Sequence, residues 1–260
     1  MAKPPGKCIF CGGGGLTKAH IFPEWLHLLN HEKTQHHLTE VGVFHTFTPQ
    51  IRSPALRRTV HQGDSGTRKV RKVCKGCNSG WLGSLETPAK PSVLRLMSET
   101  RGLIDQPMQI ALARWLCAIV MLVDASEAAL SAVPQSDRDH FRQTTNPPRS
   151  WRIWIARYAD GNWHAHRARH VGLNVLRRGD HLGMGEPDCC NTQVTTLVLR
   201  QLCAHVYSST VLELPGYEGV ALQQLWPPTD DSFLWELAPR LNDAGIIALS
   251  EALARDLQPF

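Results

Sequence analysis

The sequence predicts an α+β fold in two parts: a cysteine-framed module over residues 1–100 and a separate α+β domain over residues 101–260. Two C-x-x-C pairs frame the first part. A nine-residue apolar run at 115–123 predicts a buried helix in the second part. Residues 151–170 contain strand-like segments on both sides of Asp160-Gly161, which predicts an antiparallel sheet.

Length and hydropathy limit the class of protein. The longest apolar run, at 115–123, is far shorter than the roughly 20 residues that span a bilayer. The first 20 residues hold no apolar run of signal-peptide length. We therefore expect a cytoplasmic protein, and the sequence argues against a membrane-spanning or secreted one.

The positive charge is concentrated at the N-terminal end. Residues 1–77 contain twelve Lys or Arg and four Asp or Glu, a balance of +8, whereas the whole chain carries +5. A basic module beside a mildly acidic remainder is typical of a protein whose first part contacts a polyanion. Solvated charges on the loop 52–75 are an equally simple interpretation of charge alone.

Four of the eight cysteines form the two C-x-x-C pairs, Cys8/Cys11 and Cys74/Cys77. Four thiolates are a common ligand set for structural zinc. The 62 residues between the pairs make a long loop, whose extra closure cost is only about 1 kcal/mol. Zinc binding contributes on the order of 10 kcal/mol, so the length does not exclude one shared ion. The alternatives are two unrelated thiol pairs or a redox C-x-x-C.

The elements of the first part follow from local signals. Gly12 suits the turn of a zinc knuckle because glycine tolerates positive φ. We expect a strand at 16–21, a helix at 24–29 after Pro23, and strand-like segments at 40–48 and 68–74. A further helix is predicted from Asn78 or Ser79, with Pro88 and Pro91 ending it and a new helix at 92–99.

The second part is predicted to begin with the helix 107–123 and a polar loop at 134–150. Strand 151–158 and its return strand 162–170 then form a hairpin, further strands lie within 192–213, and a helix occupies 243–257. In the return strand His164, His166 and His170 share one face, which suits either a metal site or a plain exposed edge strand.

The motifs of the first part together resemble the HNH endonuclease family with the ββα-metal fold, and above all its zinc-knuckle branch. The resemblance covers roughly residues 7–87 and rests on the following string: Cys8-x-x-Cys11-Gly12, Leu16-Thr17-Lys18-Ala19-His20-Ile21-Phe22-Pro23, and Val73-Cys74-x-x-Cys77-Asn78-x-Gly80-Trp81-x-x-x-Leu85-Glu86.

The resemblance implies a metal-dependent endonuclease that hydrolyses DNA. His20 would be the general base, since a neutral imidazole near pH 7 accepts a proton from water. Asn78 would take the last position of the motif, where its oxygen is an acceptable ligand for Mg²⁺ or Mn²⁺. The zinc ligands would be the four paired cysteines, and DNA would contact the basic segment before them (Arg68, Lys69, Arg71, Lys72 and Lys75).

Two positions depart from the family pattern. Most members have an acidic metal ligand before the histidine, where this chain has Ala19, and the middle Asn of the motif is not evident in 31–73. His61 and Asp64 are the candidates for additional ligands.

Three functions are compatible with these features: a nuclease, a degenerate module that binds nucleic acid without cutting it, and a structural zinc domain for protein contacts. The basic segment 68–75 argues against the third, and we expect the nuclease, with the binding module as its alternative. For residues 101–260 the alternatives are ligand sensing, a protein partner or a homodimer.

Overall fold

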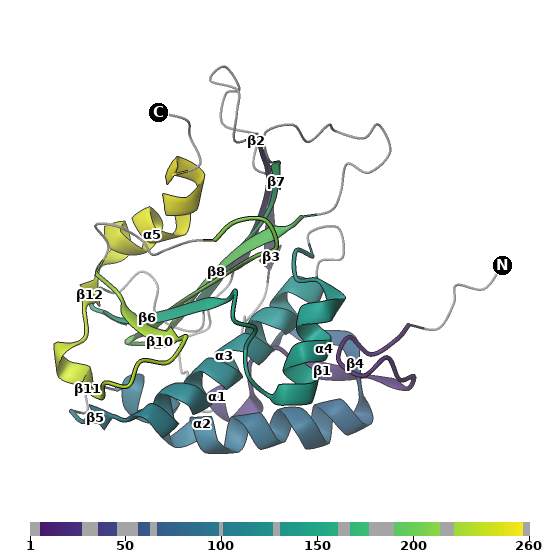
Figure 1. The fold of residues 1–260 in the computed structure, drawn as a ribbon, viewed down its shortest axis with the longest axis horizontal. Helices are drawn as coiled ribbons and strands as arrows, with labels where there is room; N and C mark the ends of the chain where they lie inside the picture. The colour runs from purple at the N-terminus through teal and green to yellow at the C-terminus, as the bar shows by residue number, and fades with distance from the viewer. Residues whose placement is uncertain are drawn as a thin grey trace.

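The computed structural model describes residues 6–27, 36–45, 57–62, 67–98, 101–126, 131–160, 167–176, 190–213 and 221–256. It is an α+β structure, as the sequence predicts. A large mixed sheet lies above a layer of helices, and a small two-stranded sheet lies at one end of that layer (Figure 1). The candidate site is built at this end.

The N-terminal elements form a two-stranded sheet followed by a helix. Strand β1 (Leu16–His20) pairs antiparallel with β4 (Lys69–Cys74), and a bulge shifts the register between Thr17 and Ala19. A π-helical stretch, Cys77–Leu82, continues from β4 into helix α2 (Gly83–Leu96). The short helix α1 (Glu24–His27) follows β1. The chain thus closes a β-β-α unit around the long insertion between β1 and β4.

Helix α2 is continuous, and the predicted break at its prolines is wrong. Pro88 and Pro91 both lie inside it. Each proline removes one backbone hydrogen bond, which usually disrupts a helix. Here Leu85, Ala89 and Val93 follow one buried stripe that packs against α3 (Gln106–Ser126). This tertiary packing offsets the local cost.

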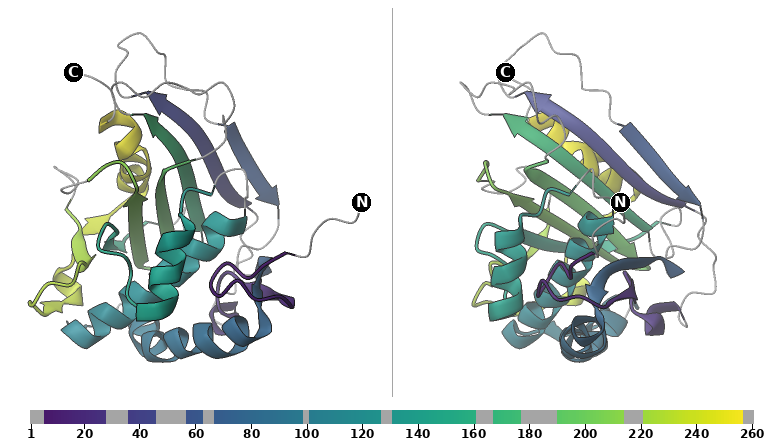
Figure 2. Two further views of the ribbon diagram at one scale, coloured as in Figure 1. Left: turned by 45° about the vertical axis from the view of Figure 1, so that its right-hand side comes forward. Right: turned by 90° about the vertical axis from the view of Figure 1, so that its right-hand side faces the viewer.

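The large sheet has the strand order β10-β6-β9-β8-β7-β2-β3, with β12 beside β6. Most neighbours are antiparallel, but β2 runs parallel to β7 and brings the insertion into the sheet (Figure 2). The bounds of its strands are β2 His36–His45, β3 Arg57–Gln62, β6 Arg152–Tyr158, β7 Arg167–Leu176, β8 Thr192–Leu199, β9 Leu202–Ser209, β10 Gln223–Trp226 and β12 Arg240–Leu241. A third, small sheet joins β5 (Leu103–Ile104) to β11 (Phe233–Leu234), which a single 3₁₀ turn, Trp235–Leu237, follows.

Helices cover both faces of the large sheet (Figure 2). Helix α3 contacts one face and is buried along most of its length, whereas α5 (Asp243–Asp256) contacts β8 on the other face. The core beneath α3 runs without a break from Cys8 and Phe10 to Trp235. The predicted division at residue 100 stays a prediction about folding units, and α2 and α3 pack together across it.

Two further sequence predictions for the second part are wrong. The supposed loop 134–150 contains helix α4 (Gln135–Thr144), whose polar sequence buries only Arg138 and Phe141. The supposed hairpin does not form, because β6 pairs with β9 and β10, whereas β7 pairs with β8 and β2. His170 is therefore buried in a central strand and not at an edge. His164 and His166 lie outside the described residues.

A buried polar cluster joins the helical layer to the sheet. Asp124 of α3 accepts hydrogen bonds from Arg138 Nη2 at 2.7 Å and from Ser131 Oγ at 2.6 Å. His170 Nε2 of β7 lies 3.6 Å from Asp124 Oδ1, and its Nδ1 lies 2.8 Å from Thr195 Oγ1. Although burial raises the pKa of Asp124, the His170 contact and the other donors lower it overall. The Asp124 carboxylate therefore stays ionised in the interior, because its hydrogen-bond and ion-pair partners compensate for its lost hydration.

Helix α3 is also apolar and long enough to pass a composition test for a membrane span, but 78% of that apolar window is buried inside the fold. A core helix of this kind passes the same test.

The folding stability is expected to fall in mild acid because of His205. This side chain is buried in β9 beside Thr196, and burial lowers its pKa to about 3. The unfolded chain takes up a proton near pH 6.5, so this effect is absent above pH 6.5 and destabilises the fold progressively as pH falls toward 3. Urea unfolding at pH 7 and pH 5 should show a loss of about 2 kcal/mol from this group. His205→Gln should remove this part of the pH dependence of the unfolding free energy. The control His140→Gln, at an exposed histidine, should keep it. Equal pH dependence in both variants would contradict the assignment to His205.

Candidate metal and nuclease site

The two C-x-x-C pairs form two turns that face each other. In the first, the Cys8 amide donates to Gly13 O at 2.8 Å and the Gly12 amide to Cys8 O at 2.9 Å. Gly12 has a φ of +69°, a conformation that favours glycine. The Ile9 amide donates to Lys72 O at 3.0 Å, which ties this turn to β4. The second pair lies where β4 ends and the helix begins.

The four sulfurs of Cys8, Cys11, Cys74 and Cys77 lie within 4.8 Å of one another, so the predicted cysteine cluster is confirmed and can hold a metal ion. Cys11 Sγ and Cys74 Sγ are 3.5 Å apart. In a tetrahedral zinc site with Zn–S bonds near 2.3 Å, neighbouring sulfurs lie about 3.8 Å apart. The donor set and the spacing both fit zinc.

The protein environment of the thiols also suits a cation. Burial raises the pKa of Cys8, but hydrogen bonds from the backbone amides of Cys74, Phe10 and Cys11 outweigh it and lower the pKa to about 7. Burial and the neighbouring Cys11 and Cys8 sulfurs raise the pKa of Cys77. Crowded thiols resist ionising together, and a divalent cation at their centre would remove that penalty.

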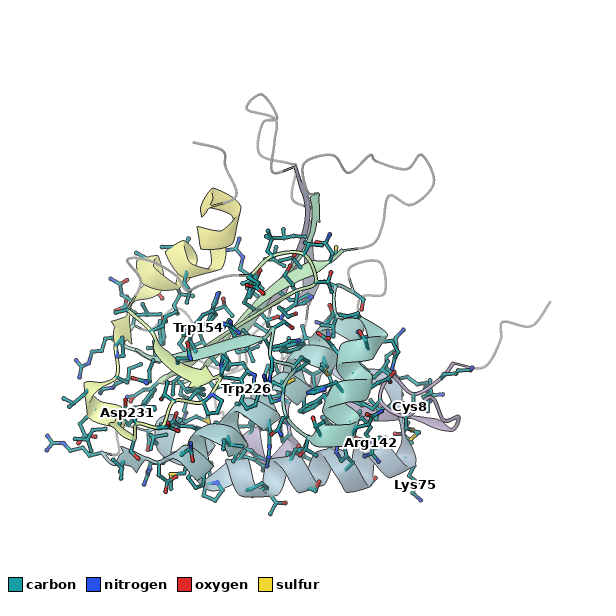
Figure 3. The ribbon with its side chains drawn as sticks, in the orientation of Figure 1. Cys8, Lys75, Arg142, Trp154, Trp226 and Asp231 are labelled. Atoms are coloured by element: carbon teal, nitrogen blue, oxygen red, sulfur yellow. The ribbon has the colours of Figure 1, made fainter. Side chains whose placement is uncertain are left out.

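The knuckle is anchored to the rest of the protein through aromatic rings. Phe10 packs edge-on against Trp81 at 4.9 Å between ring centroids, and Trp81 packs against Phe141 of α4 at 5.3 Å. The Arg142 guanidinium lies 5.0 Å from the Trp81 ring. Figure 3 shows Cys8, Lys75 and Arg142 at the same end of the molecule. Trp81 is therefore a packing residue that joins the knuckle to α4.

His20 and Asn78, which are 58 positions apart, are brought to one place by the β1–β4 pairing. His20 is the last residue of β1 and is half-buried, opposite Lys69. Asn78 lies in the first helical turn after β4 and is not the N-cap. Its side-chain nitrogen donates to Thr17 Oγ1 at 3.1 Å, which leaves its oxygen as the atom available to a ligand.

His20 and Asn78 line a single cavity of about 180 Å³ between β1, α1, α2 and α3. Its apolar wall comes largely from α3, where Trp115 is almost fully buried. Two carboxylates, Glu24 and Glu86, also line it. Neither was predicted as a site residue, because only the packing of α2 against α3 places Glu86 in this cavity.

Glu86 and Glu24 differ in their surroundings. Glu24 is exposed in the first turn of α1, whereas Glu86 is half-buried on α2. Burial raises the pKa of Glu86, and the nearby Lys90 ammonium and the Trp25 side chain partly oppose that rise. The Glu86 carboxylate is therefore partly desolvated, and Lys90 and Trp25 compensate for part of that loss of hydration.

The remaining predicted residues are distributed as follows. Lys69, Arg71 and Lys75 are exposed and Lys72 is half-buried, and within the described ranges none of the four forms an ion pair. Arg68 donates to Ser126 Oγ at 2.8 Å and thus links β4 to the end of α3.

The proposed additional metal ligands are not placed in the cavity by the structure. The backbone of His61 lies in β3 of the large sheet, whereas His20 lies in β1 of the separate two-stranded sheet. Nothing is described of the His61 side chain. Asp64 lies outside the described residues.

Comparison with models of known protein families, with curated proteins and with solved structures found no match. The arguments about function therefore depend on this chain's own residues and geometry.

Proposed function

We propose that this protein is an HNH-like, metal-dependent endonuclease that hydrolyses DNA phosphodiester bonds, with His20 as the general base and structural zinc on the four cysteines. One observation supports the proposal above all: His20 and Asn78 line the same cavity beside the cysteine cluster. The β-β-α connection of β1, β4 and α2 has the element order of the ββα-metal fold.

In this proposal each residue has a defined part in hydrolysis. His20 removes a proton from water, and the water oxygen attacks phosphorus while the bond to the leaving sugar oxygen breaks. That leaving oxygen takes a proton from solvent. The Asn78 oxygen would hold the catalytic ion, since the side-chain nitrogen donates to Thr17 Oγ1. Mg²⁺ or Mn²⁺ bound here would stabilise the negative charge on the phosphate.

The second candidate is a module that binds nucleic acid without cutting it. Ala19 favours it, because the usual acidic ligand is absent and the Ala19 side chain is wholly buried. Incubating supercoiled plasmid with the protein and Mg²⁺ or Mn²⁺ separates the two candidates. Metal-dependent nicking that EDTA stops supports the nuclease, whereas retarded but intact plasmid under every divalent metal supports the binding module.

Both candidates predict that the exposed side of β4 contacts phosphates. The double variant Lys69→Ala/Arg71→Ala should lower the slope of log affinity against log salt by about 1.8, since each lost phosphate contact removes about 0.9. Fluorescence anisotropy with a duplex oligonucleotide measures that slope. The exposed pair Arg149→Ala/Arg240→Ala removes the same charge elsewhere and should leave the slope nearly unchanged. Equal reductions in both double variants would argue for net charge alone.

A further inference from the structure

We propose that the second half of the chain binds a small phosphate monoester of a sugar or nucleoside, in a cavity at one end of the β6–β9 pair. The shared chemistry of these ligands is a terminal phosphate joined to a hydroxylated sugar. The proposal goes beyond the nuclease function, because it uses none of the residues assigned to the nuclease site.

The cavity has a volume of about 360 Å³ and lies where β6 begins and β9 ends. The two strands are antiparallel neighbours, with Arg152 opposite Tyr207. The segments 149–152 and 209–213 therefore form the two sides of the cavity. Small-molecule sites mostly have volumes of about 300 to 1,000 Å³, and this cavity is at the lower end of that range. Its size thus suits a single small ligand.

Two guanidinium groups give the cavity a positive side. Arg152 is half-buried, and its Nη1 donates to Arg149 O at 2.8 Å and to Trp151 O at 3.0 Å. These bonds hold the Arg152 guanidinium beside the cavity. Arg149 is exposed, and within the described residues neither arginine has an ion-pair partner. Because a guanidinium fork matches the oxygens of a phosphate, both side chains suit a phosphate ligand.

The opposite wall is held in shape by hydrogen bonds of the turn that follows β9. The amides of Val211 and Leu212 donate to Ser209 Oγ at 3.1 and 3.0 Å. The Thr210 amide donates to Asn191 O at 3.0 Å, which ties the turn to the start of β8. This side of the cavity is therefore formed before a ligand binds, and a preformed site loses less entropy on binding.

The charges of the lining favour a phosphate monoester over other anions. Arg149 and Arg152 supply two positive charges, whereas a carboxylate or a phosphate diester carries only one negative charge. A phosphate monoester carries about −1.5 to −2 at pH 7 and matches them. Glu213 is exposed, lines the same cavity and forms no ion pair within the described residues. Its carboxylate can accept hydrogen bonds from sugar hydroxyls and repels the extended polyanion of a duplex.

Isothermal titration calorimetry of the full-length protein with ribose 5-phosphate, in a buffer free of phosphate and sulfate, tests the proposal. We expect saturable binding of a single ligand per chain. Arg149→Gln and Arg152→Gln should each weaken it about 30-fold, because each removes charge-assisted hydrogen bonds. The matched control Arg240→Gln removes an exposed charge from β12 and should keep the affinity within about twofold.

Unfolding temperatures equal to that of wild type show that each variant is folded. The Arg149 side chain makes no hydrogen bond within the described residues, so Arg149→Gln tests the proposal even if Arg152→Gln is unstable. Absence of saturable ribose 5-phosphate binding overturns the proposal. Equal weakening in Arg149→Gln and Arg240→Gln also overturns it, since net charge alone would then explain the effect. Inorganic phosphate should bind more weakly than ribose 5-phosphate, and equal affinity would contradict the sugar part of the ligand.

The same residues separate a small ligand from nucleic acid. The double variant Arg149→Ala/Arg240→Ala should lose ribose 5-phosphate binding while it keeps the salt slope for duplex DNA. A lowered salt slope in this variant, together with no ribose 5-phosphate binding to wild type, would assign the cavity to nucleic acid and overturn the proposal. The result does not depend on nicking, so the nuclease proposal can fail while this one holds.

Discussion

Replacing His20 with Ala should reduce metal-dependent nicking by about 10³-fold, within the range that a general base contributes. The reason is that His20 is the only imidazole among the residues that line the described cavity, so no second imidazole there can take its place. Nicking of supercoiled plasmid with Mg²⁺ or Mn²⁺ measures the loss. Because the contact with phosphates comes from the exposed side of β4, the affinity for duplex DNA should stay within about threefold of wild type.

The control for this experiment is His140→Ala, which removes an exposed histidine from α4 and should nick like wild type. Zinc content should equal that of wild type in both variants, since neither residue is among the four cysteines. A folded His20→Ala protein that nicks at the wild-type rate would show that His20 is structural. Lost nicking together with lost zinc would instead indicate that His20 supports the knuckle.

The cysteine cluster could be predicted from sequence because ligand chemistry and short-range spacing are local properties. Cys8 and Cys11 can be recognised as a ligand pair from their C-x-x-C spacing alone. The free energy of metal–thiolate binding also exceeds the entropic cost of closing the long loop between the two pairs. The ends of β1 and β4 were predicted for the same reason, since alternation within six residues is local. Once these strands pair, His20 and Asn78 come together.

The rest of the site depends on contacts that no local pattern encodes. The apolar wall of the cavity is formed by α3. The sequence predicts that this helix is buried, but it does not predict which elements pack against it. Glu86 enters the cavity because α2 packs against α3, and this contact is not encoded in the local sequence. Likewise β2 joins β7 in parallel across more than a hundred residues, and such non-local pairing cannot be derived from alternation alone. Helix α4 was missed because its sequence lacks an apolar stripe.

Loss of a cysteine ligand should destabilise the fold well beyond the N-terminal module. Cys77→Ser removes one of four clustered sulfurs, and structural zinc sites contribute on the order of 10 kcal/mol. Since Phe10 packs on Trp81 and Trp81 on Phe141, a disordered knuckle also exposes the face of α4. A loss of even about 4 kcal/mol would lower the unfolding temperature by roughly 10 °C. Calorimetry beside a zinc count measures both effects, with Cys190→Ser as a control that keeps its zinc.

A chelator and a reductant together distinguish a zinc site on the four cysteines from a pair of redox thiols. If the sulfurs bind zinc, a strong chelator should lower the unfolding temperature of wild type toward that of Cys77→Ser, and dithiothreitol without chelator should change it little. If the pairs are redox thiols, dithiothreitol should change the stability and the chelator should not, because a disulfide constrains the unfolded chain whereas a metal must be bound in the folded one. Cys8, Cys11, Cys74 and Cys77 form no disulfide and their sulfurs cluster together, so the chelator is expected to have the larger effect.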